Sequence, residues 1–424
     1  MDVLIVGQGY VGLPLAMRAA RAGHRVTGID LDERRTAALR RGTSFVEDIP
    51  DSEVQHALAH LGYRAVSDYA DVDRFDVAVI TVPTPLTDSL PDLRMVESAA
   101  RALAPLIVDG ALVVLESTTH PGTTEDLLVP ILEAGSGKRA GVDFSVGYSP
   151  ERIDPGNTTW RLENTPKVVS GIDDRSLERV QAFYGGLVER IVPVAGTREA
   201  ELTKLLENTF RHVNIALVNE MAIHAEALGV DIWQVIEAAS TKPFGFMPFT
   251  PGPGVGGHCL PVDPSYLSWQ VRKQLGKPFR FVELANDVNE HMPDHVVERV
   301  SRILNDAGRA VRGARVLLLG LSYKPNTGDV RESPAMRVLE LLCERGAAVT
   351  AVDPHVEDHR WPSTAARAVD LDAALADEHD VIVLVTGHAE FDRDTVLDAG
   401  IPVLDTRNAL RSATRAATEL VETL

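Results

Sequence analysis

Residues 3–12 read VLIVGQGYVG, and this stretch decides the fold class. The short apolar run predicts a buried strand, and residues 13–22 carry the apolar spacing of a helix. Between them lie Gly7, Gly9 and Gly12, with Tyr10 and Val11 in the same turn. Glycines at this spacing permit a tight turn and the close approach of a pyrophosphate to a helix N-terminus. The segment therefore predicts a dinucleotide-binding unit in which these five residues contact the cofactor.

The next strand-like run, residues 25–29, ends at Asp30. An acid at this place accepts hydrogen bonds from both ribose hydroxyls and repels a 2′-phosphate, which favours NAD over NADP. Arg35 lies near enough in sequence to stack on the adenine, although a solvated helix arginine fits the pattern equally well. We therefore expect NAD as the cofactor.

The rest of the chain divides into three parts. Apolar runs at 76–82 and 111–115 continue the alternation of strand and helix, which predicts a parallel sheet buried on both faces. A single long helix is predicted from about residue 197 to residue 229, and further helices follow at 232–240 and 281–304. Strand, helix, strand and acid then return at 315–319, 333–345, 348–352 and Asp353. The fold class is α/β, with two Rossmann-like doubly wound parallel-sheet domains (1–196 and 306–424) joined by a long central helix and a helical region (197–305).

Composition excludes several classes of protein. The 424 residues include 42 Lys plus Arg against 61 Asp plus Glu, a formal charge of −19, whereas a nucleic-acid binder needs a basic surface. No uncharged apolar stretch approaches the roughly 18 residues of a membrane span, and the N-terminus lacks the basic start of a signal peptide. Two cysteines, Cys259 and Cys343, cannot build a disulfide framework. We expect a cytoplasmic protein without nucleic-acid or membrane partners.

The two cysteines differ in their surroundings. Cys343 has helical spacing with Val338, Leu339 and Leu342, which is typical of an inert core residue. Cys259 follows a Gly/Pro-rich stretch that we expect to be mobile and too poor in side chains to pack a core, so its thiol is a candidate nucleophile. Zinc binding is not expected, because only His258 is adjacent and no second pair of ligands lies at the required spacing. We predict no metal.

Polar residues also fall on one stripe of the long helix. Lys204 and Asn208 lie four residues apart, Arg211 and His212 come one turn later, and all four are predicted to lie opposite the apolar face. The alternative is an ordinary solvated surface. Lysine is rare here, with seven against 35 arginines, so a lysine on such a stripe favours a specific role.

In the second unit, Lys324 and Arg331 would suit a phosphate-bearing ligand, although a solvated charged loop is equally compatible.

Together these segments resemble the UDP-glucose/GDP-mannose dehydrogenase superfamily over essentially the whole chain. The matching segments are GYVGLPLA (9–16), TVPTP (81–85), ESTTHPGTT (116–124), SPERIDPGN (149–157), ELTKLLENTFRHVNIALVNE (201–220), GVGGHCLPVDP (254–264) and SYKPNTGDVRESP (322–334). Within the superfamily, PERIDPG and TKPFGFMPFTPGPGVGGHC look more like the N-acetylamino-sugar enzymes, whereas Thr250 and Ser265 depart from that pattern. The resemblance implies a homodimer through the central helices and a nucleotide-sugar substrate received by the C-terminal domain.

The resemblance also implies the chemistry, which is oxidation of the C6 alcohol of a nucleotide sugar to a carboxylate with two NAD⁺. Cys259 would trap the aldehyde as a thiohemiacetal and then carry a thioester. Lys204 and Asn208 would stabilise the oxyanion, Thr118 and Asp263 would hold a water that serves as base, with Lys204 as the second candidate base, and Glu151 would position reactants. The remaining implied contacts are Pro83, Thr84, Thr118 and Arg331 for the cofactor, and Glu151, Arg152, Lys204, Asn208, Arg211, Gly256, Lys324 and Arg407 for the substrate.

Several alternatives stay open. UDP-N-acetylglucosamine is the expected substrate, and UDP-glucose or dTDP-glucose are alternatives within the same class. A two-electron dehydrogenase of the hydroxyacid type would need the lysine but no thiol, and a nucleotide sensor would bind NAD without turnover. His258 is an alternative activator of the thiol, although adjacent side chains tend to diverge.

Overall fold

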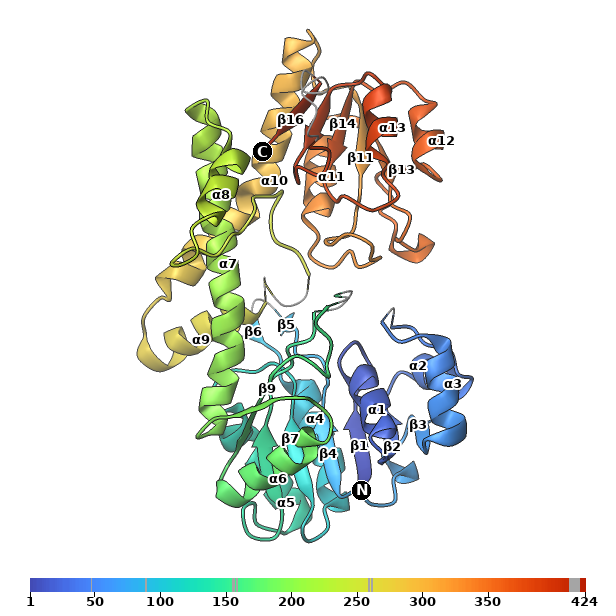
Figure 1. Ribbon diagram of the computed structural model, residues 1–424, viewed down its shortest axis with the longest axis vertical. Coiled ribbons are helices and arrows are strands. Elements are labelled where there is room, and N and C mark those ends of the chain that lie inside the picture. Colours follow the sequence, from blue (N-terminus) through green and yellow to red (C-terminus); the bar gives the residue numbers. More distant parts are fainter. Residues whose placement is uncertain are drawn as a thin grey trace. The chain divides into compact units, whose positions relative to one another are not determined.

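Two mainly parallel sheets form the framework of the protein (Figure 1). The structure, a computed structural model, describes residues 1–46, 48–87, 90–154, 157, 159–257, 260, 262–411 and 420–424. These residues group into an N-terminal unit, Met1–Glu207 with Ser265–Gln270, and a C-terminal unit, Asn208–Pro264 with Val271–Leu424. The division into three domains by sequence stays a prediction.

The N-terminal unit contains an eight-stranded sheet of order β10-β9-β8-β7-β4-β1-β2-β3. Its strands are β1 (Asp2–Val6), β2 (Arg25–Ile29), β3 (Tyr63–Val66), β4 (Val77–Ile80), β7 (Leu112–Leu115), β8 (Ser145–Tyr148), β9 (Lys167–Gly171) and β10 (Ile191–Pro193), and β5 (Leu86–Thr87) pairs with β6 (Leu90–Pro91). Its helices are α1 (Gly12–Arg21), α2 (Glu33–Arg40), α3 (Asp51–His60), α4 (Arg94–Leu103), α5 (Val129–Ser136) and α6 (Asp174–Gly185), with short turns η1 (Tyr69–Asp71), η2 (Ala104–Leu106) and η3 (Thr124–Leu128).

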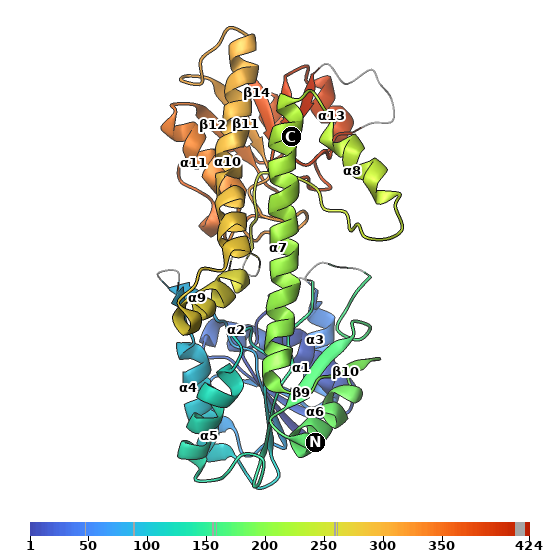
Figure 2. The same ribbon diagram turned by 90° about the vertical axis from the view of Figure 1, so that its left-hand side faces the viewer.

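Helices cover both faces of this sheet, because alternate strand residues point to opposite sides. Val3 and Ile5 pack with α1, α3 and α6, whereas Leu4 and Val6 pack with α4 and α5. Figure 2 shows α4 and α5 together on their face. One pair of strands departs from the predicted parallel arrangement, since β8 and β9 are antiparallel. Among the described residues between 149 and 166 no helix separates them, so the chain returns beside β8 without the crossover that a parallel pair requires.

The C-terminal unit repeats the design with a six-stranded parallel sheet of order β13-β12-β11-β14-β15-β16. Its strands are β11 (Arg315–Leu319), β12 (Ala348–Val352), β13 (Ala366–Arg367), β14 (Val381–Leu384), β15 (Val403–Asp405) and β16 (Val421–Thr423). Its helices are α8 (Ile232–Ser240), α10 (Arg280–Asp306), α11 (Pro334–Glu344), α12 (Leu371–Leu375) and α13 (Arg393–Asp398), with the turn η4 (Asp358–Arg360). The helices α10 and α11 pack on one face of the sheet and α12 and α13 on the other.

Two further helices contribute residues to both units. The long helix α7 (Thr197–Ala227) ends two residues before Gly229, whose φ of 68° lies in the left-handed region that favours glycine after a helix. The helix α9 (Asp263–Leu275) was not predicted from the sequence, because it follows a Gly/Pro-rich loop without a clear apolar period. The predicted class, two Rossmann-like domains and a long central helix, is confirmed.

Candidate active site

The glycine turn between β1 and α1 has the geometry that a dinucleotide requires. Gly7 has a φ of 93°, and a Cβ there would lie 2.9 Å from the Thr81 carbonyl oxygen. A Cβ on Gly12 would lie 1.8 Å from the Gly7 oxygen, so α1 can begin against the turn only with glycine there. A Cβ on Gly9 would meet no protein atom within 4 Å. The space beside Gly9 at the N-terminus of α1 therefore fits a pyrophosphate, which a side chain would displace.

The acid that follows β2 lies against this turn. Asp30 accepts hydrogen bonds from the backbone N–H of Gln8 (2.9 Å) and of Asp32 (2.9 Å), and Arg35 approaches it at 3.4 Å. Arg35 also lies over the Phe45 ring, 5.6 Å from its centre. Sequence reasoning missed Tyr63, which is buried at the edge strand and donates to the side-chain oxygen of Gln8 from below the turn. Tyr10 packs against the core, and Val11 immediately precedes α1.

A second set of predicted residues meets where β4 and β7 end. Thr84 donates to the carbonyl oxygen of Thr118 (2.8 Å), which brings the TVPTP segment with Pro83 and the ESTTHPGTT segment together. The buried Tyr266 of α9 donates to the carbonyl oxygens of Thr84 (2.8 Å) and Pro85 (3.2 Å). Tyr266 was not predicted, although it follows Cys259 by only seven residues. It ties α9 to the segments expected to hold the nicotinamide end.

Buried charges gather beside these segments. Glu151 accepts from the backbone N–H groups of Arg152 (2.7 Å) and Ile153, and its carboxylate lies 3.6 Å from the Lys167 ammonium. Arg152 pairs with Glu207 at 2.6 Å. Burial raises the pKa of Glu151, but Lys167, Glu116, the Ile153 N–H and Lys204 outweigh burial and lower it overall. Lys204 therefore acts electrostatically on Glu151. The predicted roles of these two residues stay predictions.

The structure corrects the predicted orientation of α7. Lys204 is only 8% exposed and His212 only 2%, whereas Leu206 and Leu217 of the supposed inner face are 64% and 57% exposed. Among the four stripe residues, Arg211 is exposed. His212 has a pKa lowered mainly by burial and contacts Asn286 at 2.7 Å. Lys204 and His212 are buried beside polar neighbours, Glu151 and Asn286, which a rule that assigns burial to apolar residues alone cannot show.

In the C-terminal unit, Asn208 and Asp263 are in direct contact. The Asn208 amide donates to the Asp263 carboxylate at 2.5 Å, and Asp263 is 4% exposed. Asp263 follows Cys259 by four residues in the sequence. Cys259 and His258 themselves lie outside the described residues, so their predicted roles stay predictions.

The Gly/Pro-rich segment before Cys259 is packed, contrary to the expectation of a mobile loop that cannot join a core. Residues 251–254 and Gly257 are buried. A Cβ on Gly252 would lie 2.4 Å from Arg407, and one on Gly257 would lie 2.8 Å from the ring of Tyr323. The Gly257 N–H donates to the Arg331 oxygen at 3.0 Å, and a Cβ on Gly256 would lie 2.7 Å from the Glu332 oxygen. The absence of side chains is what lets the backbone lie against its neighbours.

Two of these neighbours, Arg331 and Arg407, are predicted ligand-binding residues. The Lys324 carbonyl accepts from Ser322 (2.9 Å) and Thr327 (3.2 Å), which shapes the loop after β11. Arg331 pairs with Asp329 at 2.6 Å. Burial lowers the pKa of Arg407 to about 10, although Asp405 opposes this, so its guanidinium stays charged at neutral pH. Lys324, Arg331 and Arg407 all lie in the C-terminal unit.

Comparisons with known proteins agree over the whole chain. Models of the UDP-glucose/GDP-mannose dehydrogenase family match in three parts: the NAD binding domain at residues 1–188, the central domain at 198–291 and the UDP binding domain at 317–412. The chain belongs to this family.

Similar curated proteins carry several substrate names. The chain is 36% identical to a UDP-N-acetyl-D-glucosamine 6-dehydrogenase of Pseudomonas aeruginosa, over 92% of this chain and 91% of that protein. It is 35% identical to a UDP-N-acetyl-D-mannosamine dehydrogenase of Pyrococcus horikoshii, over 92% and 90%. A solved UDP-D-ManNAc dehydrogenase structure from Pyrococcus horikoshii superposes with a TM-score of 0.89 at 32% identity, covering 100% of this chain and 99% of the other.

As a member of this family, the protein is an NAD-dependent oxidoreductase of the nucleotide-sugar dehydrogenase type. The predicted cofactor and enzyme class are confirmed. Within the described residues, no helix combines the length and the apolar character needed to cross a membrane.

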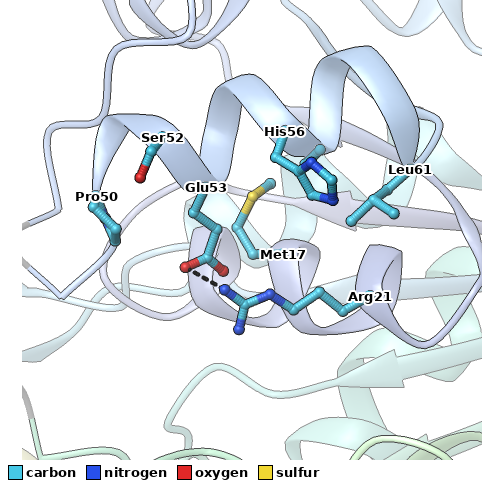
Figure 3. A pocket seen from close by; sticks show the side chains of 8 residues that line it. Met17, Arg21, Pro50, Ser52, Glu53, His56 and Leu61 are labelled. Carbon is cyan, nitrogen blue, oxygen red and sulfur yellow. Dashed lines mark ion pairs between the residues drawn. The ribbon is translucent and has the colours of Figure 1, made fainter.

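Two other features lie outside this site. A hollow of about 250 Å³ lies between α1 and α3, where Arg21 pairs with Glu53 at 2.7 Å (Figure 3). It adjoins the C-terminal end of α1, not the N-terminal end expected to meet the cofactor. In the C-terminal unit, His355, His388 and Glu390 are near one another. His388 accepts from the Asn326 N–H and contacts Asp353 at 3.0 Å, so both its ring nitrogens are already engaged by the protein.

Proposed function

We propose that the enzyme oxidises the C6 alcohol of a nucleoside diphosphate sugar to a carboxylate in two two-electron steps through a thioester on Cys259. The observation that carries this proposal is the contact between Asn208 and Asp263, because it joins α7 to the residues that directly follow Cys259 in the chain. The family match over all three parts supports the reaction class.

In the proposed mechanism, NAD⁺ held at the turn of Gly7, Gly9 and Gly12 would supply the hydride acceptor for both oxidations. Water held by Thr118 and Asp263 takes the alcohol proton in the first step, and Lys204 is the alternative base. The Cys259 thiolate then adds to the aldehyde carbon, and the resulting thiohemiacetal becomes a thioester when the second hydride leaves. Water attacks the thioester, which releases the carboxylic acid and restores the thiol.

The buried side chains suit charge that develops on the substrate oxygen. Lys204 is a cation at a site of low exposure, and the Asn208 amide is fixed by its bond to Asp263. Fixed donors of this kind stabilise an oxyanion in the transition state by about 3 kcal/mol each. Glu151, with two backbone N–H groups fixing one carboxylate oxygen, would position the reactants.

For the substrate we propose UDP-N-acetylglucosamine. The segments PERIDPG and TKPFGFMPFTPGPGVGGHC support an N-acetylated sugar, and relatives named for UDP-N-acetyl-D-glucosamine and UDP-N-acetyl-D-mannosamine match at similar identity. UDP-glucose and dTDP-glucose are the alternatives. Lys324 and Arg407 would hold the diphosphate, with Arg152, Arg211 and Gly256 near the sugar and Arg331 toward the cofactor.

The test measures how many NADH molecules form per molecule of nucleotide sugar. The substrates are UDP-GlcNAc, UDP-ManNAc, UDP-GalNAc, UDP-glucose and dTDP-glucose. We expect two NADH per sugar, with the highest kcat/KM for UDP-GlcNAc. Cys259→Ser should stop acid formation, whereas Cys343→Ser is the matched control, since Cys343 lies on α11 and contacts the Thr364 oxygen at 3.7 Å. One NADH per sugar, unchanged by Cys259→Ser, would instead show a two-electron dehydrogenase without covalent catalysis. NAD binding without turnover on any of these sugars would favour the nucleotide sensor.

We further propose a homodimer through the central helices. Support comes from large apolar side chains exposed on α7 (Phe210, Leu217, Met221) and on α10 (Phe281, Leu284), since contiguous exposed apolar surface is typical of an interface. Light scattering should give twice the 46.0 kDa chain mass, and Leu217→Glu should halve it. A monomeric wild type would contradict this assignment. The cytoplasmic location expected from the sequence stays a prediction.

A further inference from the structure

A buried group of charges lies at the carboxyl edge of the N-terminal sheet. The Lys167 side chain is 3% exposed, that of Glu116 is 0% exposed and that of Glu151 is 10% exposed. The Lys167 ammonium forms an ion pair with Glu116, donates to the Pro150 oxygen at 3.1 Å and lies 3.6 Å from Glu151. The Tyr184 hydroxyl donates to the other Glu116 oxygen at 2.6 Å. Lys167 is therefore held on one side by a fixed carboxylate and faces Glu151 on the other.

The antiparallel strand β9 produces this arrangement. Gly147 lies opposite Gly171 and Tyr148 opposite Ser170, and the same register continued past β8 places Lys167 opposite Glu151. Glu116 follows β7 directly, and β7 pairs with β8 in parallel up to Leu115 and Tyr148. A parallel β9 would bring its other end to this edge. The strand reversal thus brings a lysine to the edge of the sheet where α/β proteins bind ligands.

The ionisable side chains around Glu151 come from four parts of the N-terminal unit. They are Glu116 after β7, Lys167 on β9, Tyr184 on α6 and Lys204 on α7. Burial raises the pKa of Glu116, with Glu151 acting in the same direction and Lys167 opposing them. Burial lowers the pKa of Lys167, but the two carboxylates outweigh it and raise the value overall. The same surroundings thus raise the pKa of Glu116 and lower that of Glu151.

We propose that Lys167 is a positioning residue that keeps Glu151 ionised and correctly directed, and that Glu116 and Tyr184 hold Lys167 for this purpose. The inference deepens the proposed function and rests on it, because that function places Glu151 among the reacting groups. Removal of Lys167 leaves a carboxylate in a site of low exposure without its nearest cation, so Glu151 should take up a proton at a higher pH.

The test is a pH titration of Glu151 by infrared spectroscopy of the full-length protein labelled with ¹³C-glutamate. Glu151→Gln identifies the band, because it removes that carboxyl alone. The main variant is the double substitution Glu116→Gln with Lys167→Met. It replaces a buried ion pair with neutral groups of similar size, a change that folded proteins often tolerate. The glutamine oxygen can still accept from Tyr184.

The variants should separate the roles of the two residues. In the double variant, Glu151 should titrate higher than in the wild type by about one to three pH units, the range expected for loss of a cation within ~4–6 Å. In Glu116→Gln alone it should titrate below the double variant, because Lys167 remains 3.6 Å from Glu151. Lys167→Arg should stay near the wild-type value. A merely structural role for the pair would disturb Glu151 alike whether or not Lys167 is present, and equal titration in the double variant and the wild type would overturn the inference.

Turnover provides the second readout. The acid limb of kcat/KM should move with the infrared titration, while the KM for NAD should change less than twofold. The infrared result does not need turnover, so the two proposals fail separately. Inactivity of the wild type on every nucleotide sugar would contradict the proposed function alone. An unmoved Glu151 band in an active double variant would contradict the role of Lys167 alone.

Discussion

The two Rossmann-like units begin with the same local structure and then diverge. Gly7 and Gly320 each follow the first strand with positive φ, and each donates its N–H to the last residue of the next strand, Ile29 (2.8 Å) or Val352 (2.9 Å). A Cβ on either glycine would strike the carbonyl oxygen of a threonine, Thr81 or Thr386. After this shared turn, α1 starts five residues later at Gly12, whereas α11 starts fourteen residues later at Pro334.

The difference changes how each unit can bind phosphate. In the N-terminal unit we expect phosphate at the helix N-terminus, in the open space beside Gly9, with no cation in the turn. In the C-terminal unit the longer loop carries Lys324 and Arg331. The acids that follow β2 and β12 also differ in their burial and in their hydrogen bonds. The Asp30 side chain is 10% exposed and accepts from two backbone N–H groups. The Asp353 side chain is fully buried, accepts from four backbone N–H groups and contacts His388. One framework therefore leaves its acid partly exposed, where we expect a ligand, and the other uses its acid to hold a loop.

The largest expected effect comes from the shared glycines. Gly7→Ala and Gly320→Ala should each destabilise their own unit by about 4 kcal/mol, since backbone strain costs roughly 1–3 kcal/mol and overpacking adds a similar amount. We expect Gly7→Ala to lose NAD binding and Gly320→Ala to lose UDP binding. Calorimetric titration with each nucleotide at low temperature measures both.

Two alanine substitutions at other glycines separate the effect of backbone strain from the effect of filling the space for the pyrophosphate. Gly23 has a φ of 88° but no atom within 4 Å of an added Cβ, so Gly23→Ala should show the cost of strain alone. Gly9→Ala should keep full stability and still lose NAD, because the Cβ enters only the space left for the pyrophosphate. Equal loss of both nucleotides in Gly7→Ala would show that the two turns are not independent.

A smaller effect is a pH dependence of opposite sign in the two units. In the N-terminal unit, Glu201 accepts from Gly122 and Thr124, and burial, partly opposed by these bonds, raises its pKa to about 7. Its protonated form is favoured on folding, so the N-terminal unit should lose up to about 3 kcal/mol as pH rises from 4.5 to 7. The pKa of Asp353 is lowered to about 2 because hydrogen bonds and His388 outweigh its burial. The C-terminal unit should therefore lose about 2 kcal/mol as pH falls from 3.8 to 2.

Hydrogen exchange read by mass spectrometry, corrected for the intrinsic effect of pH, measures each unit by itself. Peptides covering residues 197–207 report on Glu201, and those covering residues 321–333 report on Asp353. Glu201→Gln should flatten only the first pH dependence and Asp353→Asn only the second. Protection that changes in the same direction in both units would contradict the opposite signs.

The fold followed from the sequence because its strands are short apolar runs and its turns carry glycines. The strands 25–29, 315–319 and 348–352 were predicted with their observed bounds. The failures involve interactions that no local pattern records. The helix α9 packs through Tyr266, and the reversal of β9 follows from a connection without a helix.

The candidate site was predictable mainly where a motif has a fixed local shape. The glycine turn and Asp30 meet as predicted, because both follow strands of one sheet. The resemblance to a family assigned Asn208 and Asp263 to one site, but their direct contact was not predicted. In contrast, Lys167 and Tyr184 belong to no motif, and Gln8 lies between two motif glycines without a predicted role. Glu116 is 51 residues from Lys167 and 68 from Tyr184, and Tyr63 is 55 residues from Gln8. Glu151 is nearer in sequence to Lys167, but the two meet only because β9 is reversed. Burial of Lys204 and His212 on α7 was missed because it too depends on distant partners.

The smallest effect concerns the one lysine of the C-terminal loop. If, as proposed, the N-terminal turn binds phosphate through backbone N–H groups and Lys324 supplies a full charge, the affinity for UDP-sugar should fall more steeply with salt than the affinity for NAD. Lys324→Ala should weaken UDP-sugar binding about tenfold, roughly 1.4 kcal/mol, and remove most of that extra salt dependence. NAD binding should not change. The exposed Lys277 is the matched control, since Lys277→Ala alters the net charge of −19 equally but lies between α9 and α10. If Lys277→Ala weakened UDP-sugar binding as much as Lys324→Ala did, the general field of an acidic protein would explain the salt effect, and the contrast between the two turns would fail.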